Sequence, residues 1–220
     1  YVQPNSTSLA VNRVTGGEGS KILGSMSSNG RLMILDPNGV FFGKTAKMDV
    51  GGILASTGHL DQANEDQLMA GNPFVLQHLD ANPDAKIENQ GWITAKSGGL
   101  VAFVAPWVVN SGFISANLGQ VTLAAAKKVT VDLAGDNLIS IAVGDKLEKA
   151  LIENSGTIAA QGGKVVISAN AAKGIVDEVI NMSGVVQANS FSRKGGKIVL
   201  GATGGDMRSS RSAAVAISCA

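Results

Sequence analysis

A nine-residue pattern that recurs through the second half of the chain constrains the fold more than any other feature. It reads apolar, any, Asn, any, Gly, any, apolar, any, Ala, and it occupies residues 87–95, 108–116, 152–160 and, more loosely, 180–188. Each copy is followed by a glycine and a second alternating segment, at 99–104, 119–123, 163–167 and 196–200. Alternation with a period of two predicts short strands, and the Asn and Gly positions predict the corners between them.

The spacing of the repeat indicates how the strands are connected. Intervals of 21, 44 and 28 positions separate the repeat glycines, which are Gly91, Gly112, Gly156 and Gly184. One coil of roughly twenty residues explains the first interval, two coils explain the second, and one coil with an insertion explains the third. We place the extra coil at 129–133 together with 138–143. Because such units bury their apolar rows only by stacking, the sequence predicts an all-β fold, a parallel β-helix with short extra-helical hairpins.

Equivalent positions of successive repeats carry similar side chains, so we expect them to lie one above another in the stack. The corner asparagines are Asn89, Asn110 and Asn154. Their amides can hydrogen bond along a ladder, or each Asn can simply favour its own turn, and both alternatives predict the same fold. Trp92 and Phe113 also occupy equivalent places, which indicates either a stacked aromatic patch or a platform for a sugar.

A tight turn lies earlier in the chain, between the apolar runs 32–35 and 40–42. Its residues are Asp36, Pro37, Asn38 and Gly39. The residue types fit a type I turn, because Asp accepts a hydrogen bond from the backbone two residues on, Pro presets φ, and Gly tolerates a positive φ. The segment predicts a strand, a turn and a strand, with a further short strand at 46–50 and no room for a helix between them.

Residues 29–43, continued by residues 50–57, resemble the secretion domain of two-partner secretion (TPS) exoproteins of the filamentous-haemagglutinin type. The hallmark of that family is Asn-Pro-Asn-Gly followed by a β-branched residue, and this chain has Asp36 in place of the first Asn. Asp initiates such a turn at least as well, so the replacement keeps the turn and removes an uncharged amide. The resemblance is densest over residues 2–57 and extends over essentially the whole chain.

The resemblance implies a fold, a partner and a location. It implies a right-handed parallel β-helix, in agreement with the general rule for parallel crossovers. It also implies one domain over residues 1–220, cut at both ends of a longer exoprotein, with the signal motif and excursions in 1–86 and the repeated coils in 87–220. In the family, this domain is recognised by a cognate outer-membrane TpsB transporter of the Omp85 superfamily, crosses unfolded and folds outside. We therefore expect a secreted or cell-surface protein of a Gram-negative bacterium that passes through the periplasm, with an adhesin as the first expectation.

The same resemblance points to particular residues. By match to the family motif, the four residues of the turn at 36–39 are candidates for the secretion signal. Their alternative role is structural, because loss of a tight turn lowers stability and thereby secretion. Asn12 and Arg13 are candidates for contact with the transporter, and the structural alternative for Arg13 is a surface ion pair or a cap on backbone carbonyls.

Charge and composition argue against several other kinds of partner and site. The formal net charge of +1 argues against a nucleic-acid partner, and the single cysteine, Cys219, excludes an intramolecular disulfide and a multi-cysteine metal site. The polar stretch 60–73 lacks the ligand spacing of a calcium loop, so it predicts a solvated loop. His59 and His78 flank this stretch without other ligands at metal-site spacing, so we expect loop or surface imidazoles, no metal and no cofactor.

Parallel β-helices also serve polysaccharide-active enzymes, so the fold alone does not exclude catalysis. Such enzymes need carboxylates clustered on one exposed face, whereas no predicted strand here repeats an outward Asp or Glu and no Gly-x-Ser-x-Gly elbow occurs. The sequence therefore predicts a non-enzymatic export module, expected to be a monomer. The alternative from another class is an adhesive or carbohydrate-binding surface, through which the full-length protein would contact host cells, with Trp92, Trp107 and Phe113 as its aromatic residues.

Overall fold

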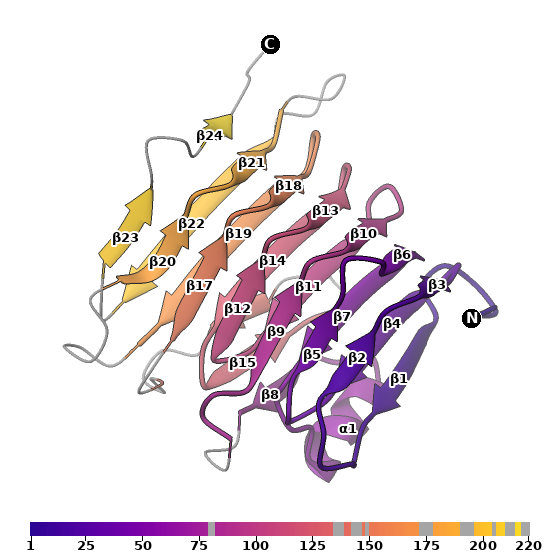
Figure 1. Cartoon of the computed structure of the whole chain (residues 1–220). Coiled ribbons are helices and arrows are strands. Elements are labelled where there is room, and N and C mark those ends of the chain that lie inside the picture. The colour runs from indigo at the N-terminus through magenta and orange to yellow at the C-terminus, as the bar shows by residue number, and fades with distance from the viewer. Residues whose placement is uncertain are drawn as a thin grey trace.

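Three parallel sheets form the walls of the structure, and successive turns of the chain contribute one strand to each sheet (Figure 1). This computed structural model describes residues 1–78, 82–133, 139–141, 147, 150–171, 178–189, 196–203, 206–209 and 214–216. Sheet A contains β1 (Leu9–Arg13), β4 (Arg31–Leu35), β7 (Gly52–Ser56), β11 (Leu100–Val104), β14 (Gln120–Ala125), β19 (Lys164–Asn170) and β22 (Lys197–Thr203). Sheet B contains β2 (Ser20–Ile22), β5 (Val40–Phe42), β9 (Lys86–Asn89), β12 (Trp107–Asn110), β17 (Leu151–Asn154), β20 (Glu178–Met182) and β23 (Asp206–Ser209). Sheet C contains β3 (Ser25–Ser27), β6 (Lys47–Val50), β10 (Trp92–Ala95), β13 (Phe113–Ala116), β18 (Thr157–Ala159), β21 (Val185–Gln187) and β24 (Ala214–Ala216).

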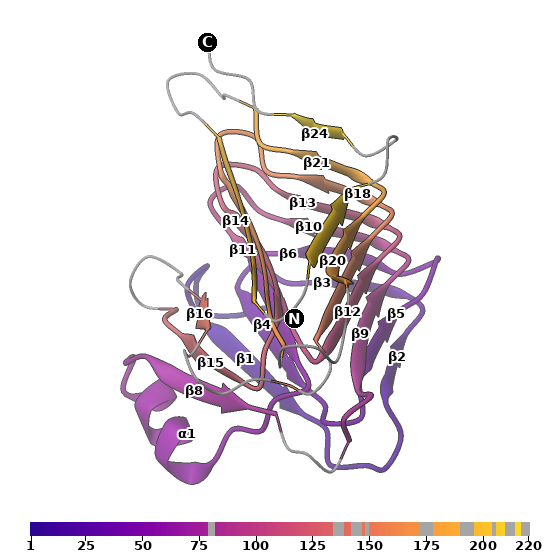
Figure 2. The same ribbon diagram turned by 90° about the vertical axis from the view of Figure 1, so that its left-hand side faces the viewer.

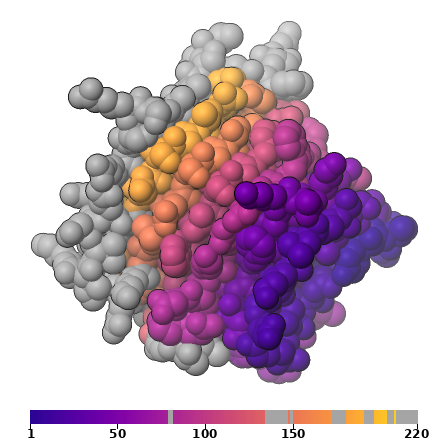
Figure 3. Space-filling view, viewed as in Figure 1, coloured from indigo at the N-terminus to yellow at the C-terminus, as the bar shows by residue number. Residues whose placement is uncertain are grey.

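The inward side chains of the three sheets make one continuous core along the stack. The chain passes from sheet B to sheet C to sheet A in each coil, and the coils appear as successive bands in the space-filling view (Figure 3). Ile87, Ile93, Val101 and Phe103 are all fully buried in this core. The predicted parallel β-helix is confirmed, because strand pairing within all three sheets is parallel.

Glycines stack at the corner between sheets B and C. A Cβ atom at Gly112 would lie 2.2 Å from the carbonyl oxygen of Gly91 in the preceding coil. The equivalent distances are 2.1 Å from Gly156 to the oxygen of Gly112 and 2.1 Å from Gly184 to that of Gly156. The repeat therefore requires Gly because successive coils approach too closely for any side chain.

A second apolar core lies on the outer face of sheet A. An antiparallel sheet, made of β8 (Phe74–Gln77), β15 (Lys128–Val131) and β16 (Ile139–Ile141), packs there beside the helix α1 (Gln62–Met69) (Figure 2). This second core includes Met33, Leu35, Leu54, Leu60, Phe74, Leu76, Leu100, Ala102, Val104, Ala124, Val129 and Val131. β4, β7 and β11 of sheet A are consequently buried on both faces, which explains why each carries a continuous apolar run and does not alternate.

The extra coil that we expected at 129–133 and 138–143 is wrong. β14 pairs directly with β19, so the interval of 44 positions is one coil with a long insertion. Within that insertion β15 pairs antiparallel with β8 and with β16, outside the helix. An alternating apolar segment has the same pattern in a coil and in an external sheet that packs on one face, so periodicity alone does not separate the two.

The solvated loop expected at 60–73 is also wrong, because it contains α1. The Asp61 carboxylate caps this helix by accepting a hydrogen bond from the backbone N–H of Asn64, 2.8 Å away, and this bond lowers the pKa of Asp61. No side chain of α1 is buried, so the helix has no apolar stripe to indicate it. Among the described residues, no helix is both long and apolar enough to cross a membrane.

The two histidines that flank the excursion differ in their surroundings. His59 is exposed, as expected. His78 was expected in a loop or on the surface. It lies outside any strand, directly after β8, but it is only 4% exposed, so the surface alternative is wrong. The backbone N–H of His78 donates to the carbonyl oxygen of Lys127, which holds the excursion against the later insertion. Cys219 lies outside the described residues.

Candidate functional site

The turn at residues 36–39 joins β4 in sheet A to β5 in sheet B. The backbone N–H of Gly39 donates to the carbonyl oxygen of Asp36 at 3.0 Å, which closes the turn. The backbone N–H of Asn38 donates to Oδ1 of Asp36, also at 3.0 Å. Gly39 has a φ of +114°, a conformation that favours glycine. The turn therefore has the hydrogen bonds and the backbone conformation that its residue types predict.

Asp36 connects this turn to the coils on both sides. Its side chain is fully buried, and Oδ2 accepts hydrogen bonds from the backbone N–H of Ser20 at 2.8 Å and from the Ser20 hydroxyl at 2.6 Å. Ser20 belongs to the preceding coil. The backbone N–H of Asp36 donates to the carbonyl oxygen of Ser56, in the following coil, at 3.0 Å. One residue thus links three successive coils.

The outer side of the turn is half-exposed at Pro37 and Asn38. The Asn38 side-chain amide donates to the carbonyl oxygen of Gly16 at 2.8 Å. A hollow of about 220 Å³ lies beside the turn, lined among others by Asn38, Phe41 and Lys86. A Cβ atom at Gly39 would lie 2.6 Å from the carbonyl oxygen of Lys86, so the next coil packs directly against the turn.

An ion pair borders this hollow. Lys86 Nζ lies 2.7 Å from Oε2 of Glu88, and the Gln90 side-chain amide donates to Oε1 of Glu88 at 2.6 Å. Partial burial alone would raise the pKa of Glu88, but the hydrogen bonds from Lys86 and Gln90, with the charge of Lys86, outweigh it and lower the pKa. Glu88 is therefore ionised at neutral pH and balances the charge of Lys86.

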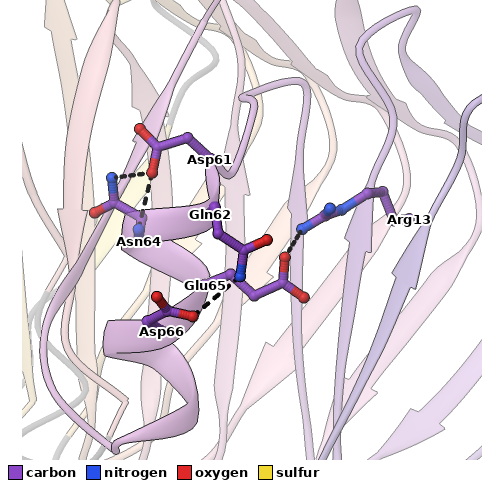
Figure 4. A network of polar contacts seen from close by, with 6 residues as sticks. All are labelled: Arg13, Asp61, Gln62, Asn64, Glu65 and Asp66. Carbon is purple, nitrogen blue, oxygen red and sulfur yellow. Dashed lines mark hydrogen bonds and ion pairs between the residues drawn. The ribbon is translucent and has the colours of Figure 1, made fainter.

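Asn12 and Arg13, the expected transporter contacts, lie at the end of β1. Arg13 forms an ion pair of 3.0 Å with Glu65 of α1 (Figure 4). The Asn12 side chain accepts a hydrogen bond from the Tyr1 hydroxyl at 2.8 Å and donates to the carbonyl oxygen of Met33 at 3.4 Å. In the folded chain both side chains therefore contribute to holding the first strand in place.

Asn89, Asn110 and Asn154 lie in one row inside sheet B. The Asn89 amide donates to Oδ1 of Asn110 at 2.8 Å, and the Asn110 amide donates to Oδ1 of Asn154 at 2.7 Å. The strand register places Phe42 before this ladder and Met182 after it. The ladder is thus a buried polar segment of three coils with an apolar residue at each end.

The structure brings together two of the three candidate aromatic residues. Trp92 and Phe113 stack on the outer face of sheet C, with ring centroids 4.0 Å apart. Trp107 lies on sheet B, where its indole N–H donates to Oε1 of Glu153 at 2.9 Å and Lys86 Nζ lies 5.0 Å from the ring centroid. The three side chains therefore do not form one surface.

Sequence reasoning missed Ser20, the main partner of Asp36. Ser20 precedes Asp36 by sixteen positions and belongs to another coil, so no local signal connects the two residues. It also missed Lys86, Glu88 and Phe41 beside the turn, because they come together only when the coils stack. Within the described residues, no three His, Cys, Asp or Glu side chains are grouped so that they could hold a metal ion.

Comparison with known proteins gives a consistent result. A family model described as the TPS secretion domain matches residues 1–210. Two curated relatives named heme/hemopexin-binding protein, both from Haemophilus influenzae, are 34% identical over 205 residues and 30% identical over 223 residues, and each match covers 92% of this chain. The crystal structure of the HMW1 secretion domain from Haemophilus influenzae matches with a TM-score of 0.83 and 30% identity, covering 98% of this chain and 54% of that one.

These matches define the part of a protein to which this chain corresponds. The chain spans 22% and 23% of the length of the two curated relatives. The family match runs across the coils and across the turn at 36–39. Because the family model matches nearly the whole described chain and the fold is the same parallel β-helix, this chain belongs to the TPS secretion domain family.

Proposed function

We propose that this chain is the N-terminal export module of a large exoprotein of a Gram-negative bacterium. A cognate TpsB transporter of the Omp85 superfamily recognises the module in the periplasm, and the module crosses the outer membrane unfolded. It folds at the cell surface, where the exoprotein is released or stays attached. Membership of the TPS secretion domain family supports this proposal.

Folding outside the cell supplies the free energy for export in this proposal. Each coil that emerges can pair with the coil before it and bury side chains such as Ile93 and Ile114. Return of a folded coil through the transporter would require it to unfold again. The nearest-neighbour stacking of the three sheets supports this coil-by-coil mechanism.

The observation that carries the proposal at residue level is the difference between the two sides of the turn at 36–39. Asp36 and Gly39 are buried and hold three coils together, whereas Pro37 and Asn38 are half-exposed. We infer that the buried side acts in folding and that Pro37 and Asn38 are the part of the motif available to the transporter.

Two substitutions separate these roles. Asn38→Ala removes the half-exposed amide and one hydrogen bond to Gly16, which costs about 1 kcal/mol of unfolding free energy. Gly39→Ala forces a methyl group against Lys86 and disfavours the positive φ, so it impairs folding. Asn82→Ala is the matched control, because the Asn82 amide contacts the carbonyl oxygen of Pro37 at 3.4 Å without belonging to the turn.

Each variant is tested for transporter-dependent release and, as purified protein, for its thermal midpoint. We expect Asn38→Ala to lose most release while its midpoint falls by only a few degrees, as a cost of about 1 kcal/mol implies for a domain of this size. Gly39→Ala is expected to lose release and to have a much lower thermal midpoint. Asn82→Ala is expected to keep the release and the thermal midpoint of the wild type. If release follows the midpoint in all three variants, the turn acts only in folding.

Asn12 and Arg13 remain proposed transporter contacts. Their contacts in the folded chain, with Tyr1, Met33 and Glu65, do not form in an unfolded chain in transit, so both side chains are then free to bind a transporter. The test compares Arg13→Ala with Glu65→Ala, each made alone. Loss of release without loss of stability in Arg13→Ala, and not in Glu65→Ala, supports contact between Arg13 and the transporter. Equal effects of the two single substitutions would assign Arg13 to the ion pair.

The role of the full-length exoprotein is a further part of the proposal. We take adhesion to host cells or their carbohydrate as the first candidate, with this domain itself non-enzymatic. The second candidate is capture of heme or hemopexin, because the two curated relatives carry that name. A pull-down of hemopexin by the full-length secreted protein, compared with this domain alone, distinguishes the two.

A further inference from the structure

The outer face of sheet C carries a surface feature that export does not use. β3, β6, β10 and β13 are neighbouring strands of this sheet (Figure 1). Their parallel register aligns the outward side chains in two columns across neighbouring coils. The first column contains Ser25, Lys47, Trp92 and Phe113. The second column contains Ser27, Asp49, Thr94 and Ser115.

Trp92 stands at the edge of a groove on this face. Its side chain is 55% exposed, and its ring stacks on Phe113 of the following coil with an interplanar angle of 27°. Phe113 covers one face of the indole, so the opposite face is directed toward the preceding coils. A hollow of about 730 Å³ lies there over β3, β6 and β10, with Trp92 in its wall.

The remaining residues around the groove supply small hydroxyls, two opposite charges and two methionines, Met26 and Met48. Ser25, Ser27 and Thr94 provide hydroxyl groups that both donate and accept. Asp49 provides a carboxylate, and Lys47 provides an ammonium group. Neither charged group belongs to the ion pairs Arg13–Glu65 and Lys86–Glu88 of the described residues, so both are available to a ligand.

We propose that this groove binds a saccharide chain. A sugar ring has an apolar C–H face, which can stack on the free face of Trp92, and a rim of hydroxyls, which can bond to Asp49, Lys47 and the serine hydroxyls. The volume of the groove lies within the range of small-molecule sites. The combination of one aromatic wall with closely spaced donors and acceptors matches the two surfaces of a sugar ring.

A protein partner fits this face less well. Among the large apolar side chains that are exposed in the described residues, Trp92 alone belongs to a strand of sheet C. Interface cores need several aromatic or aliphatic anchors over roughly 800 Å² per partner. A nucleic acid is disfavoured by the net charge of +1 and by Asp49 in the groove. The proposal is independent of export, because the groove lies on a different sheet from the turn at 36–39 and its neighbours.

The experiment uses the folded chain on a glycan array of neutral, sialylated and sulfated oligosaccharides. The oligosaccharide with the strongest signal is then titrated into a Trp107→Phe background, in which Trp92 is the only tryptophan reporter. We expect saturable binding that changes the fluorescence of Trp92. The affinity measured by calorimetry should be the same for wild type and Trp107→Phe. Trp92→Ala is expected to weaken binding about tenfold, through the lost stack.

Asp49→Asn keeps the proposal testable if Trp92→Ala alters folding. Asp49 is exposed and the change is nearly isosteric, so we expect an unchanged thermal midpoint and several-fold weaker binding. The proposal is overturned if wild type binds no glycan on the array. It is also overturned if Trp92→Ala and Asp49→Asn bind as tightly as wild type, or if binding is lost only with changes at Trp107.

Discussion

Substitution of Asp36 tests whether the turn is a junction between coils. The buried Asp36 carboxylate accepts hydrogen bonds from the Asn38 N–H, the Ser20 N–H and the Ser20 hydroxyl, at 3.0, 2.8 and 2.6 Å. Asp36→Ala removes all three, although the Ser20 N–H keeps a bond of 3.0 Å to the carbonyl oxygen of Gly39. Asp36→Asn, which restores the family residue, keeps one side-chain oxygen and replaces the other with an NH₂ group.

The structure gives an order of magnitude for each change. Hydrogen bonds to a charged group contribute about 1.5–3 kcal/mol each, and coupled bonds do not add fully, so Asp36→Ala should lower the unfolding free energy by about 3–5 kcal/mol. In Asp36→Asn the oxygen can stay on the Asn38 N–H, and the Ser20 hydroxyl can rotate to accept from the new NH₂. The Asn38 N–H then keeps a neutral acceptor and the Ser20 N–H loses its side-chain acceptor, which together costs about 1–2 kcal/mol.

Urea unfolding followed by circular dichroism measures these differences. Asp49→Asn is the matched control, because it removes a carboxylate from an exposed strand position and should change stability by less than about 0.5 kcal/mol. The slope of the unfolding free energy against urea concentration should not change, since each variant keeps the same fold. A loss below about 0.5 kcal/mol in Asp36→Ala, or a larger loss in Asp36→Asn than in Asp36→Ala, would refute the junction.

Two further predictions concern the stack, and a third concerns the ion pair between β1 and α1. Asn110→Ala leaves buried amide groups of its neighbours without a partner, so unfolding free energy should fall by about 2–5 kcal/mol, and a fall below about 1 kcal/mol in urea unfolding would contradict the ladder. Gly112→Ala should cost about 3 kcal/mol or more in the same assay, whereas Gly16→Ala, which meets no atom within 4 Å, should be neutral. A double-mutant cycle on Arg13 and Glu65, both 39% exposed, should give a coupling of about 0–1 kcal/mol that falls in high salt, and a coupling insensitive to salt would argue against a surface ion pair.

The repeated part of the fold could be predicted from sequence because each requirement recurs at the same place. Gly112 and its equivalents are required by the close approach of coils, and Ile93 and its equivalents fill the interior. Both constraints act on single positions of every coil, so they leave a periodic signal in the chain. The corner asparagines follow the same rule, with Asn110 between two others in the ladder.

The excursions could not be predicted because their constraints come from outside the local sequence. Residues 128–131 alternate like a strand of a coil, but they pack on the outer face of sheet A. The sequence signal for that second core was the continuous apolar runs of sheet A, such as 32–35 and 100–104, which indicate burial on both faces without identifying the partner. α1 buries no side chain, so the capping residue Asp61 was its main local signal.

The candidate site, like the fold, could be predicted from the sequence only in part. The turn at 36–39 could be predicted from residue types, because its hydrogen bonds from Asn38 and Gly39 to Asp36 are local. Its contacts to Ser20 and Lys86 depend on which coils become neighbours, and no local pattern contains that information. Trp107 was grouped with Trp92 by residue type, but its position at the start of β12 places it on another sheet.

Export by a partner transporter is the central claim, and release from cells tests it most directly. The chain is expressed behind a signal peptide, with its native flanking sequence, in cells that contain or lack the cognate TpsB transporter. We predict protease-resistant β-helix in the medium or on the surface only when the transporter is present, and periplasmic, protease-sensitive chain when it is absent. Equal release without the transporter would contradict the account.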